Sequence, residues 1–146
     1  GLNTAIETCG YVPWCHIQVA LRYVDLILFD LKHTNPEVHR RLAGADNHQI
    51  LDNLLRVVRD GANLIVRVPI IPEMNDSVGD IESIGQVVSA LKPTPPIELL
   101  PYHRLGISKY KALGREYRLE SVRPPGQHEI QKLQKALKEM GLEVVR

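Results

Sequence analysis

The alternation of short apolar runs with longer segments of helical periodicity is the feature that most constrains the fold. Four runs contain the apolar and β-branched residues typical of strands, and two of them are almost continuously apolar, which is typical of strands covered on both faces. Strands that alternate with helices of about 10–15 residues predict βαβ units. We therefore expect an α/β fold with three or four parallel strands. These strands are expected near residues 2–8, 24–31, 64–71 and 97–100.

Capping residues and glycines mark where several helices begin and end. Asn35-Pro36 opens a short helix that Gly44 ends, and Asp46 with Gln49 three residues later resembles a capping box before the next helix. Further helices are expected after Pro13, after residues 75–77 and after Pro124-Pro125. The polar stretch that contains Gly106 and Gly114 predicts a loop, Pro69 should mark the end of its strand, and residues 142–145 predict a final strand.

Composition excludes several classes of protein. With 146 residues, 44% hydrophobic and a net charge of +1, residues 1–146 are expected to form one ordered domain without repeats or a flexible linker. No run of basic residues predicts nucleic-acid binding, and no apolar stretch approaches the roughly 18–20 residues that span a bilayer. Two cysteines are too few for a disulfide framework and fit a reducing compartment, so we expect a cytoplasmic location. The chain begins at Gly1 with a strand-like segment, and we interpret it as a piece of a longer protein.

Charged residues follow the predicted strands at their carboxyl ends, where parallel α/β folds gather their functional groups. The first strand closes in Glu7-Thr8, and the second in Asp30-Leu31-Lys32-His33, which places Asp30 and Lys32 on one side. Arg67 lies inside an apolar strand, and His103 follows the fourth. Such a rim suits a ligand with carboxylate and amine groups, and its acids alone could hold a cation.

Simpler interpretations stay open for each of these residues. A charged residue that leaves a strand is often only solvated, and Arg67 could form a structural salt bridge with Asp30 or Glu7. Cys9 is best interpreted as a small, half-buried residue. The histidines on predicted helices are expected to be exposed rather than to bind metal. These are His16, His39, His48 and His128.

Three segments, in this order and spacing, resemble a known family over essentially the whole chain. They are residues 4–11, 28–33 and 99–106, followed by Lys109-Tyr110, Leu113-Gly114 and Glu116-Tyr117. The chain resembles the C-terminal half of the glycyl-radical-enzyme activating enzymes. The resemblance implies a parallel (β/α) half-barrel, which is the C-terminal part of the partial, TIM-like barrel of radical S-adenosylmethionine proteins.

The resemblance also implies a function for the parent protein. Enzymes of this family are oxidoreductases that use S-adenosylmethionine and a [4Fe-4S] cluster to generate a radical on a backbone glycine of a partner, such as pyruvate formate-lyase. Flavodoxin or a ferredoxin-type protein is the implied electron donor. The cysteine motif of the cluster is absent, since Cys9 and Cys15 cannot supply it. We therefore expect the isolated chain to supply part of the cofactor pocket and to be inactive alone.

The resemblance assigns roles to the residues at the strand ends. Lys32 and His103 would contact the methionine part of the cofactor, and Asp30 would hold the ribose side or a cation. The implied cofactor-binding residues are Glu7, Asp30, Lys32, Arg67 and His103. A monovalent cation is implied at Glu7, Thr8 and Asp30, although the family commonly has aspartate where this chain has Glu7. Two other readings remain, namely another radical S-adenosylmethionine or barrel enzyme that shares the scaffold, and a non-catalytic module that docks a partner.

Overall fold

The computed structural model describes residues 1–145, and within them the strands form one sheet in which every neighbouring pair is parallel. The strands follow one another across the sheet in sequence order. They are β1 (Ala5–Thr8), β2 (Leu26–Asp30), β3 (Leu64–Ile70), β4 (Ile97–Pro101) and β5 (Val144–Val145). The predicted α/β fold, the order of its first four strands and the final strand are therefore confirmed.

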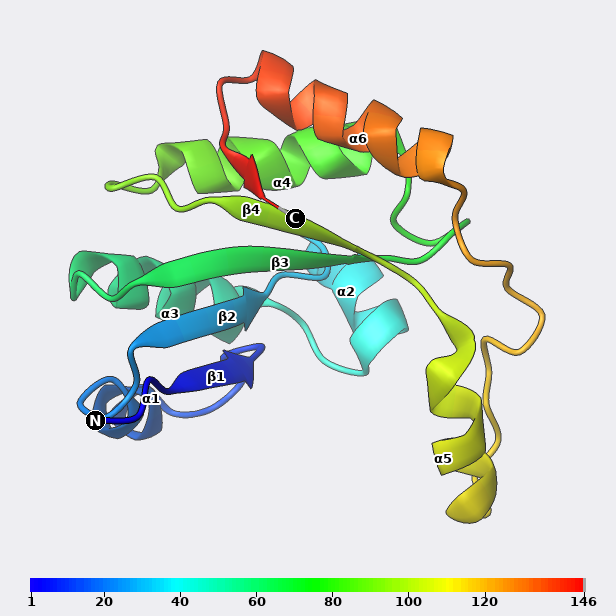
Figure 1. Ribbon diagram of the computed structural model, residues 1–146, viewed down its shortest axis with the longest axis horizontal. Coiled ribbons are helices and arrows are strands. Elements are labelled where there is room, and N and C mark those ends of the chain that lie inside the picture. Colours follow the sequence, from blue (N-terminus) through cyan, green and yellow to red (C-terminus); the bar gives the residue numbers. More distant parts are fainter. Residues whose placement is uncertain (146) are drawn as a thin grey trace.

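The larger helices cover one face of this sheet. Apolar side chains of α1, α3, α4 and α6 share one core with the buried residues of the strands, such as Phe29, Val66 and Ile97, which are aligned across the sheet. Helix α5 lies apart from this layer, beyond the carboxyl ends of the strands (Figure 1). The helices are α1 (Trp14–Ala20), α2 (Pro36–Ala43), α3 (His48–Arg59), α4 (Val78–Ala90), α5 (Ile107–Ala112) and α6 (Gln127–Glu139).

The second face of the sheet is not covered by these helices. Along β3 the residues alternate strictly between buried and half-exposed, with Ile65, Arg67 and Pro69 on the half-exposed side. On β2, Leu26 and Leu28 are likewise only half-buried. The interpretation of the continuous apolar runs as strands covered on both faces is therefore wrong for residues 1–145, because the apolar residues between the core positions face this uncovered side. An open inner face is what the predicted half-barrel implies.

The ends of most elements follow the predicted signals. Asn35 caps α2 by accepting hydrogen bonds from the N–H groups of Glu37 and Val38, and Gly44 ends the helix in the left-handed conformation. Strand β3 ends one residue after Pro69. Within residues 1–145, no helix combines the length and apolar character needed to cross a membrane.

Two local predictions are wrong. Helix α3 has no capping box at Asp46, because its N-cap is Asn47, and Asp46 instead accepts a hydrogen bond from the N–H of His48. The polar stretch after β4 contains a short 3₁₀ helix (Arg104–Gly106) and α5. Its Lys, Ala and Tyr residues permit a helix, and the glycines at both ends limit that helix to six residues.

The turn after β1 depends on Gly10. Its φ is +67°, and a Cβ added there would lie 2.5 Å from Cζ of Phe29, whose ring is fully buried. We expect Gly10→Ala to lower the free energy of unfolding by about 3 kcal/mol, from the left-handed backbone and the overpacked ring together. Gly114→Ala is the matched control, since its φ is +64° with no atom within 4 Å, and it should lose only about 1 kcal/mol. Urea unfolding measures both, and equal losses would contradict the proposed contact with Phe29.

Candidate functional site

Arg67 lies at the centre of the uncovered sheet face, with acidic residues on three sides. In the strand register Arg67 is aligned with Asp30 on β2 and with Glu98 on β4. Its Nη1 lies 2.6 Å from Oε1 of Glu7, and its Nε lies 3.2 Å from Oε2 of Glu98. The Arg67 side chain is only 16% exposed, although that of Glu7 is 69% exposed. The salt bridge between Arg67 and Glu7, one of the alternatives from the sequence, is therefore present.

The charge of Arg67 is held by these carboxylates. Burial disfavours the charged guanidinium, but the hydrogen bond and charge of Glu7, with the charges of Glu98 and Asp30, outweigh burial and raise the pKa of Arg67 above its ordinary value. The Nε atom is nevertheless buried without a hydrogen bond, because its contact with Glu98 is an ion pair without hydrogen-bond geometry. One buried donor of this site therefore remains free.

Lys32 lies next to this cluster, just beyond the carboxyl end of β2. Its Nζ is 3.5 Å from Oδ2 of Asp30, and both side chains are about one third exposed, at 34% and 28%. This ion pair is long and accessible, so both groups can bind something else without losing a strong interaction. The uncovered face thus presents two cations and three carboxylates side by side.

Two of the predicted site residues do not join this group. His103 is exposed after β4, where its Nδ1 accepts a hydrogen bond from the N–H of Leu105, and it forms no ion pair with another described residue. The Thr8 hydroxyl accepts a hydrogen bond from the N–H of Gly10. Because consecutive strand residues point to opposite faces, Thr8 directs its side chain away from the face that carries Glu7.

A site residue that the sequence analysis missed is Glu98. It lies inside the apolar strand β4 with a side chain 22% exposed, and it shares the row of Asp30 and Arg67. The available signal was the same as for Arg67, namely a charge between apolar neighbours in a predicted strand.

Buried asparagines hold the loops that follow the strands. The Nδ2 of Asn53 donates hydrogen bonds to the carbonyls of Gly10 and Val12, after β1. The Nδ2 of Asn47 donates in the same way to the carbonyls of His33 and Thr34, after β2. Each amide thus satisfies carbonyls that no strand or helix pairs.

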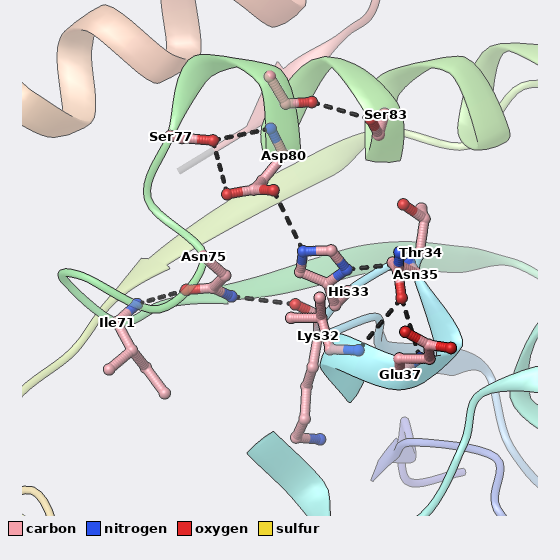
Figure 2. A network of polar contacts seen from close by, with 12 residues as sticks. Lys32, His33, Thr34, Asn35, Glu37, Ile71, Asn75, Ser77, Asp80 and Ser83 are labelled. Atoms are coloured by element: carbon pink, nitrogen blue, oxygen red, sulfur yellow. Dashed lines mark hydrogen bonds and ion pairs between the residues drawn. The ribbon is translucent and has the colours of Figure 1, made fainter. Parts of the chain in front are cut away.

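Asn75 ties the ends of two strands together next to Lys32. Its Nδ2 donates to the carbonyl of Lys32 at 3.0 Å and to that of Pro69 at 2.7 Å, while its Oδ1 accepts from the N–H of Ile71 at 2.8 Å. The side chain is almost fully buried. Figure 2 shows this amide between β2 and the loop after β3, with the Lys32 side chain pointing away from the network. Asn75 therefore fixes the backbone from which Lys32 projects.

A second contact joins the loop after β2 to α4. The Nδ1 of buried His33 accepts a hydrogen bond from the N–H of Asn35, so its Nε2 carries the proton and donates to Asp80 at 3.2 Å (Figure 2). The expectation that His39 is exposed is wrong, because its ring is buried with Nδ1 2.6 Å from the carbonyl of Ala45. The hydrogen bond with the carbonyl of Ala45 satisfies the buried ring of His39 and ties α2 to the turn that follows it.

The described residues do not fit an iron–sulfur cluster. No three His, Cys, Asp or Glu side chains in residues 1–145 are grouped as a metal site would require. Cys9, half-buried after β1, and Cys15, exposed on α1, are both free. A [4Fe-4S] cluster needs more thiolates than these two cysteines provide.

Replacing Arg67 should expose the repulsion among its acidic neighbours. We expect Arg67→Met to lower the free energy of unfolding by about 2 kcal/mol at pH 7.5, less than for a fully buried pair because Glu7 is largely exposed. The difference should shrink in about 1 M NaCl, because salt screens the interaction between charges that are partly exposed. Urea unfolding at low and high salt measures this, with Arg22→Met as an exposed control. An equal loss at both salt concentrations would show that packing, not charge, is the cause.

The role of Asn75 can be tested in the same way. Asn75→Ala leaves two carbonyls and one N–H without their partner in a buried place, so we expect a loss of about 3 kcal/mol. Asn63 is the control, since it is exposed and makes a single 3.3 Å bond to the carbonyl of Asp25. Asn63→Ala should lose less than about 1 kcal/mol. Similar stabilities of the two variants would show that the hydrogen bonds of Asn75 do not hold the strand ends together.

Comparison with known proteins gives a consistent set of relatives, although no family model matches the chain. The chain is 37% identical over 150 residues to (2S)-3-sulfopropanediol dehydratase activating enzyme of Klebsiella oxytoca, covering 99% of this chain and 47% of that protein. It is 42% identical to choline trimethylamine-lyase activating enzyme of Oleidesulfovibrio alaskensis, covering 82% and 40% respectively. It is 31% identical to pyruvate formate-lyase 1-activating enzyme of Escherichia coli K12, covering 99% and 60%. The chain spans about half the length of these relatives.

Solved structures agree on the fold. A domain of pyruvate-formate lyase-activating enzyme from Bacteroides vulgatus superposes with a TM-score of 0.80 at 23% identity, covering 99% of this chain and 80% of that one. A radical SAM methyltransferase from Sphaerobacter thermophilus gives 0.68 at 16% identity, covering 97% and 39%. The fold is thus that of radical S-adenosylmethionine proteins, and the similarity to activating enzymes along nearly the whole chain shows that it belongs to the glycyl-radical-enzyme activating enzyme family.

Proposed function

We propose that this chain is the C-terminal half of a radical S-adenosylmethionine activase that generates a glycyl radical on a partner enzyme. In this proposal, the uncovered sheet face forms one wall of the S-adenosylmethionine pocket. The observation that carries the proposal is the group of Glu7, Asp30, Lys32 and Arg67 on that face. Glu7, Asp30 and Lys32 lie at or just beyond the carboxyl ends of β1 and β2, and Arg67 is aligned with Asp30 in β3. A place in the activating-enzyme family supports the same conclusion.

The residues of this wall fit the chemistry of S-adenosylmethionine. The cofactor has a carboxylate, an ammonium group, two ribose hydroxyls and a sulfonium, and so needs both cations and hydrogen-bond acceptors. Lys32 would face the carboxylate, since its 3.5 Å contact with Asp30 is weak and its side chain is accessible. Asp30 would accept from the ribose hydroxyls. Arg67, already bound to Glu7 and paired with Glu98, would hold the acids in place.

His103 and the cation site are finer parts of the same proposal. His103 would contact the methionine portion, which requires its exposed ring to turn from Leu105 toward the sheet face. A monovalent cation would lie between Glu7 and Asp30. Thr8 would take part only through its main-chain carbonyl, because its hydroxyl is bonded to Gly10.

The cluster would belong to another part of the full-length activase. Cys9 and Cys15 do not fit its ligand set, so we derive no step through it in this chain, and the chain alone would be inactive. When bound, S-adenosylmethionine supplies the radical chemistry, and the residues of this wall bind and orient it. The proposed setting is the cytoplasm, with a glycyl radical enzyme such as pyruvate formate-lyase as partner and flavodoxin or a ferredoxin-type protein as electron donor.

Lys32→Ala in the full-length, cluster-loaded protein tests this proposal. A charge-assisted contact is worth roughly 1.5–3 kcal/mol, so S-adenosylmethionine should bind at least about tenfold more weakly. The cluster absorbance should not change, because Lys32 is not one of its ligands. Equilibrium titration of the cofactor measures the affinity. Lys92→Ala is the matched control, since Lys92 is exposed beyond α4 and contacts only the carbonyl of Ser89.

The two variants separate a local effect from a general one. Wild-type affinity in Lys32→Ala would reject the role of Lys32. An equal loss in Lys32→Ala and Lys92→Ala would show that only net charge matters, and would also overturn the assignment.

A further inference from the structure

A hollow lies between α2, the loop after β3 and the segment that contains α5. Its volume is about 490 Å³, within the usual range of about 300–1,000 Å³ for ligand sites. Arg41, at the end of α2, and Arg115 and Arg118, in the turn after α5, line it, and we call it the arginine pocket. Its remaining lining is mostly apolar and includes Leu42, Ile71, Met74 and Leu119.

The arginines of this pocket are not neutralised by the protein. Among the ion pairs of residues 1–145, none involves Arg41, Arg115 or Arg118. Nearby basic residues do find partners, since Lys111 pairs with Glu120 and Arg123 with Glu129. Glu116 is the acidic residue of the lining, against three guanidinium groups. The pocket therefore keeps an excess of positive charge.

This charge is part of a wider asymmetry. Residues 104–123 contain six basic and two acidic side chains, a net charge of +4 in a chain whose total is only +1. The rest of the chain is therefore net negative. The sequence shows no basic run here because one to four other residues separate each basic residue from the next. The asymmetry emerges once residues 104–123, which we call the projection, are folded together.

Apolar side chains are exposed on the same projection. Leu105 is 77% exposed and Leu113 is 67% exposed, both well above what burial in a core would leave. Figure 1 shows that α5, which lies between them in sequence, stands apart from the sheet and its helices. A small anion in the arginine pocket would leave these two leucines in water, whereas a polypeptide would cover them.

The projection has a fixed shape. The Tyr102 hydroxyl donates to the carbonyl of Leu119 at 2.9 Å, and the guanidinium of Arg104 donates to that of Val122 at 3.0 Å. The rings of Tyr110 and Tyr117 pack edge to face with centroids 5.0 Å apart. The surface of the projection is thus formed before anything binds, which lowers the entropy lost on association.

We propose that the arginine pocket and the exposed leucines beside it bind an acidic segment of the partner protein, with Asp or Glu side chains alternating with apolar ones. This inference rests on the proposed function and deepens it. Helix α2 follows the strand that carries Asp30, and the projection follows β4, so the pocket borders the strand ends that carry the proposed cofactor site. A segment held there brings the adjoining stretch of the partner to that site.

Fluorescence anisotropy of this 146-residue chain with a labelled peptide tests the inference. The probe is a twelve-residue peptide in which Glu and Asp alternate with Leu and Tyr, and the control peptide carries Lys at the acidic positions. The acidic peptide should bind, and added salt should weaken it. The Arg115→Glu/Arg118→Glu variant should lose at least about tenfold in affinity, since two charge-assisted contacts become repulsive.

A matched variant changes the same net charge elsewhere. Arg22 and Arg59 are exposed toward the amino ends of the strands, after α1 and at the end of α3, so Arg22→Glu/Arg59→Glu should change the affinity less than about twofold. Met74→Glu, which places a carboxylate in the pocket wall at a residue 37% exposed, should also weaken binding. Circular dichroism checks that each variant is folded.

Each result decides the inference without the cofactor. Equal losses in the two double variants, equal binding of the acidic and basic peptides, or undiminished binding by Met74→Glu would overturn it. Because no cofactor is present, peptide binding can fail while S-adenosylmethionine binding still depends on Lys32, and the reverse outcome is equally visible.

Discussion

The ion pairs of Arg67 are the interaction on which the arrangement of the uncovered face depends. A guanidinium that is only 16% exposed in a β-strand is costly unless acids surround it, and Glu7, Asp30 and Glu98 supply those acids from three other strands. The requirement works in both directions, since the same carboxylates would repel one another without Arg67. The parallel register therefore places the acidic residues next to Arg67. A face that carries these charges suits a polar ligand better than an apolar helix.

The buried asparagines extend this control from the strands to the loops. Irregular loops at strand ends leave carbonyls unpaired, and each amide of Asn47, Asn53 and Asn75 satisfies two of them at once. In Asn75 the same group also links the backbone of Lys32 to the end of β3. The position of the proposed cofactor ligand is thus set by a residue that never reaches the cofactor, and the surface charges can be accessible while their backbone is rigid.

The strands and the strand-end residues were predictable because periodicity and burial are local signals. Apolar runs identified the strands, and the rule that parallel strands gather their carboxyl ends identified Glu7, Asp30, Lys32 and Arg67. Glu98 and the asparagine clamps were not predicted, since an asparagine before a helix looks like a cap whether or not its amide turns inward. These features depend on contacts between residues far apart in sequence. An apolar run by itself does not show whether one face of a strand or both are covered, and it was the half-barrel implied by the resemblance that predicted helices on one face only.

The two proposed binding regions use opposite physical designs, and this difference follows from what each would hold. On the uncovered face, two cations are partly paired with three carboxylates, which suits a cofactor that carries a carboxylate, an ammonium group and a sulfonium. The arginine pocket is unbalanced, unpaired and bordered by exposed leucines, which suits a large partner that brings its own carboxylates and apolar residues. Both regions lie at the carboxyl ends of the strands, since α2 and the segment after β4 lead from one to the other. In the two proposals, a small molecule and a protein therefore bind near one end of the strands without competing for the same charges.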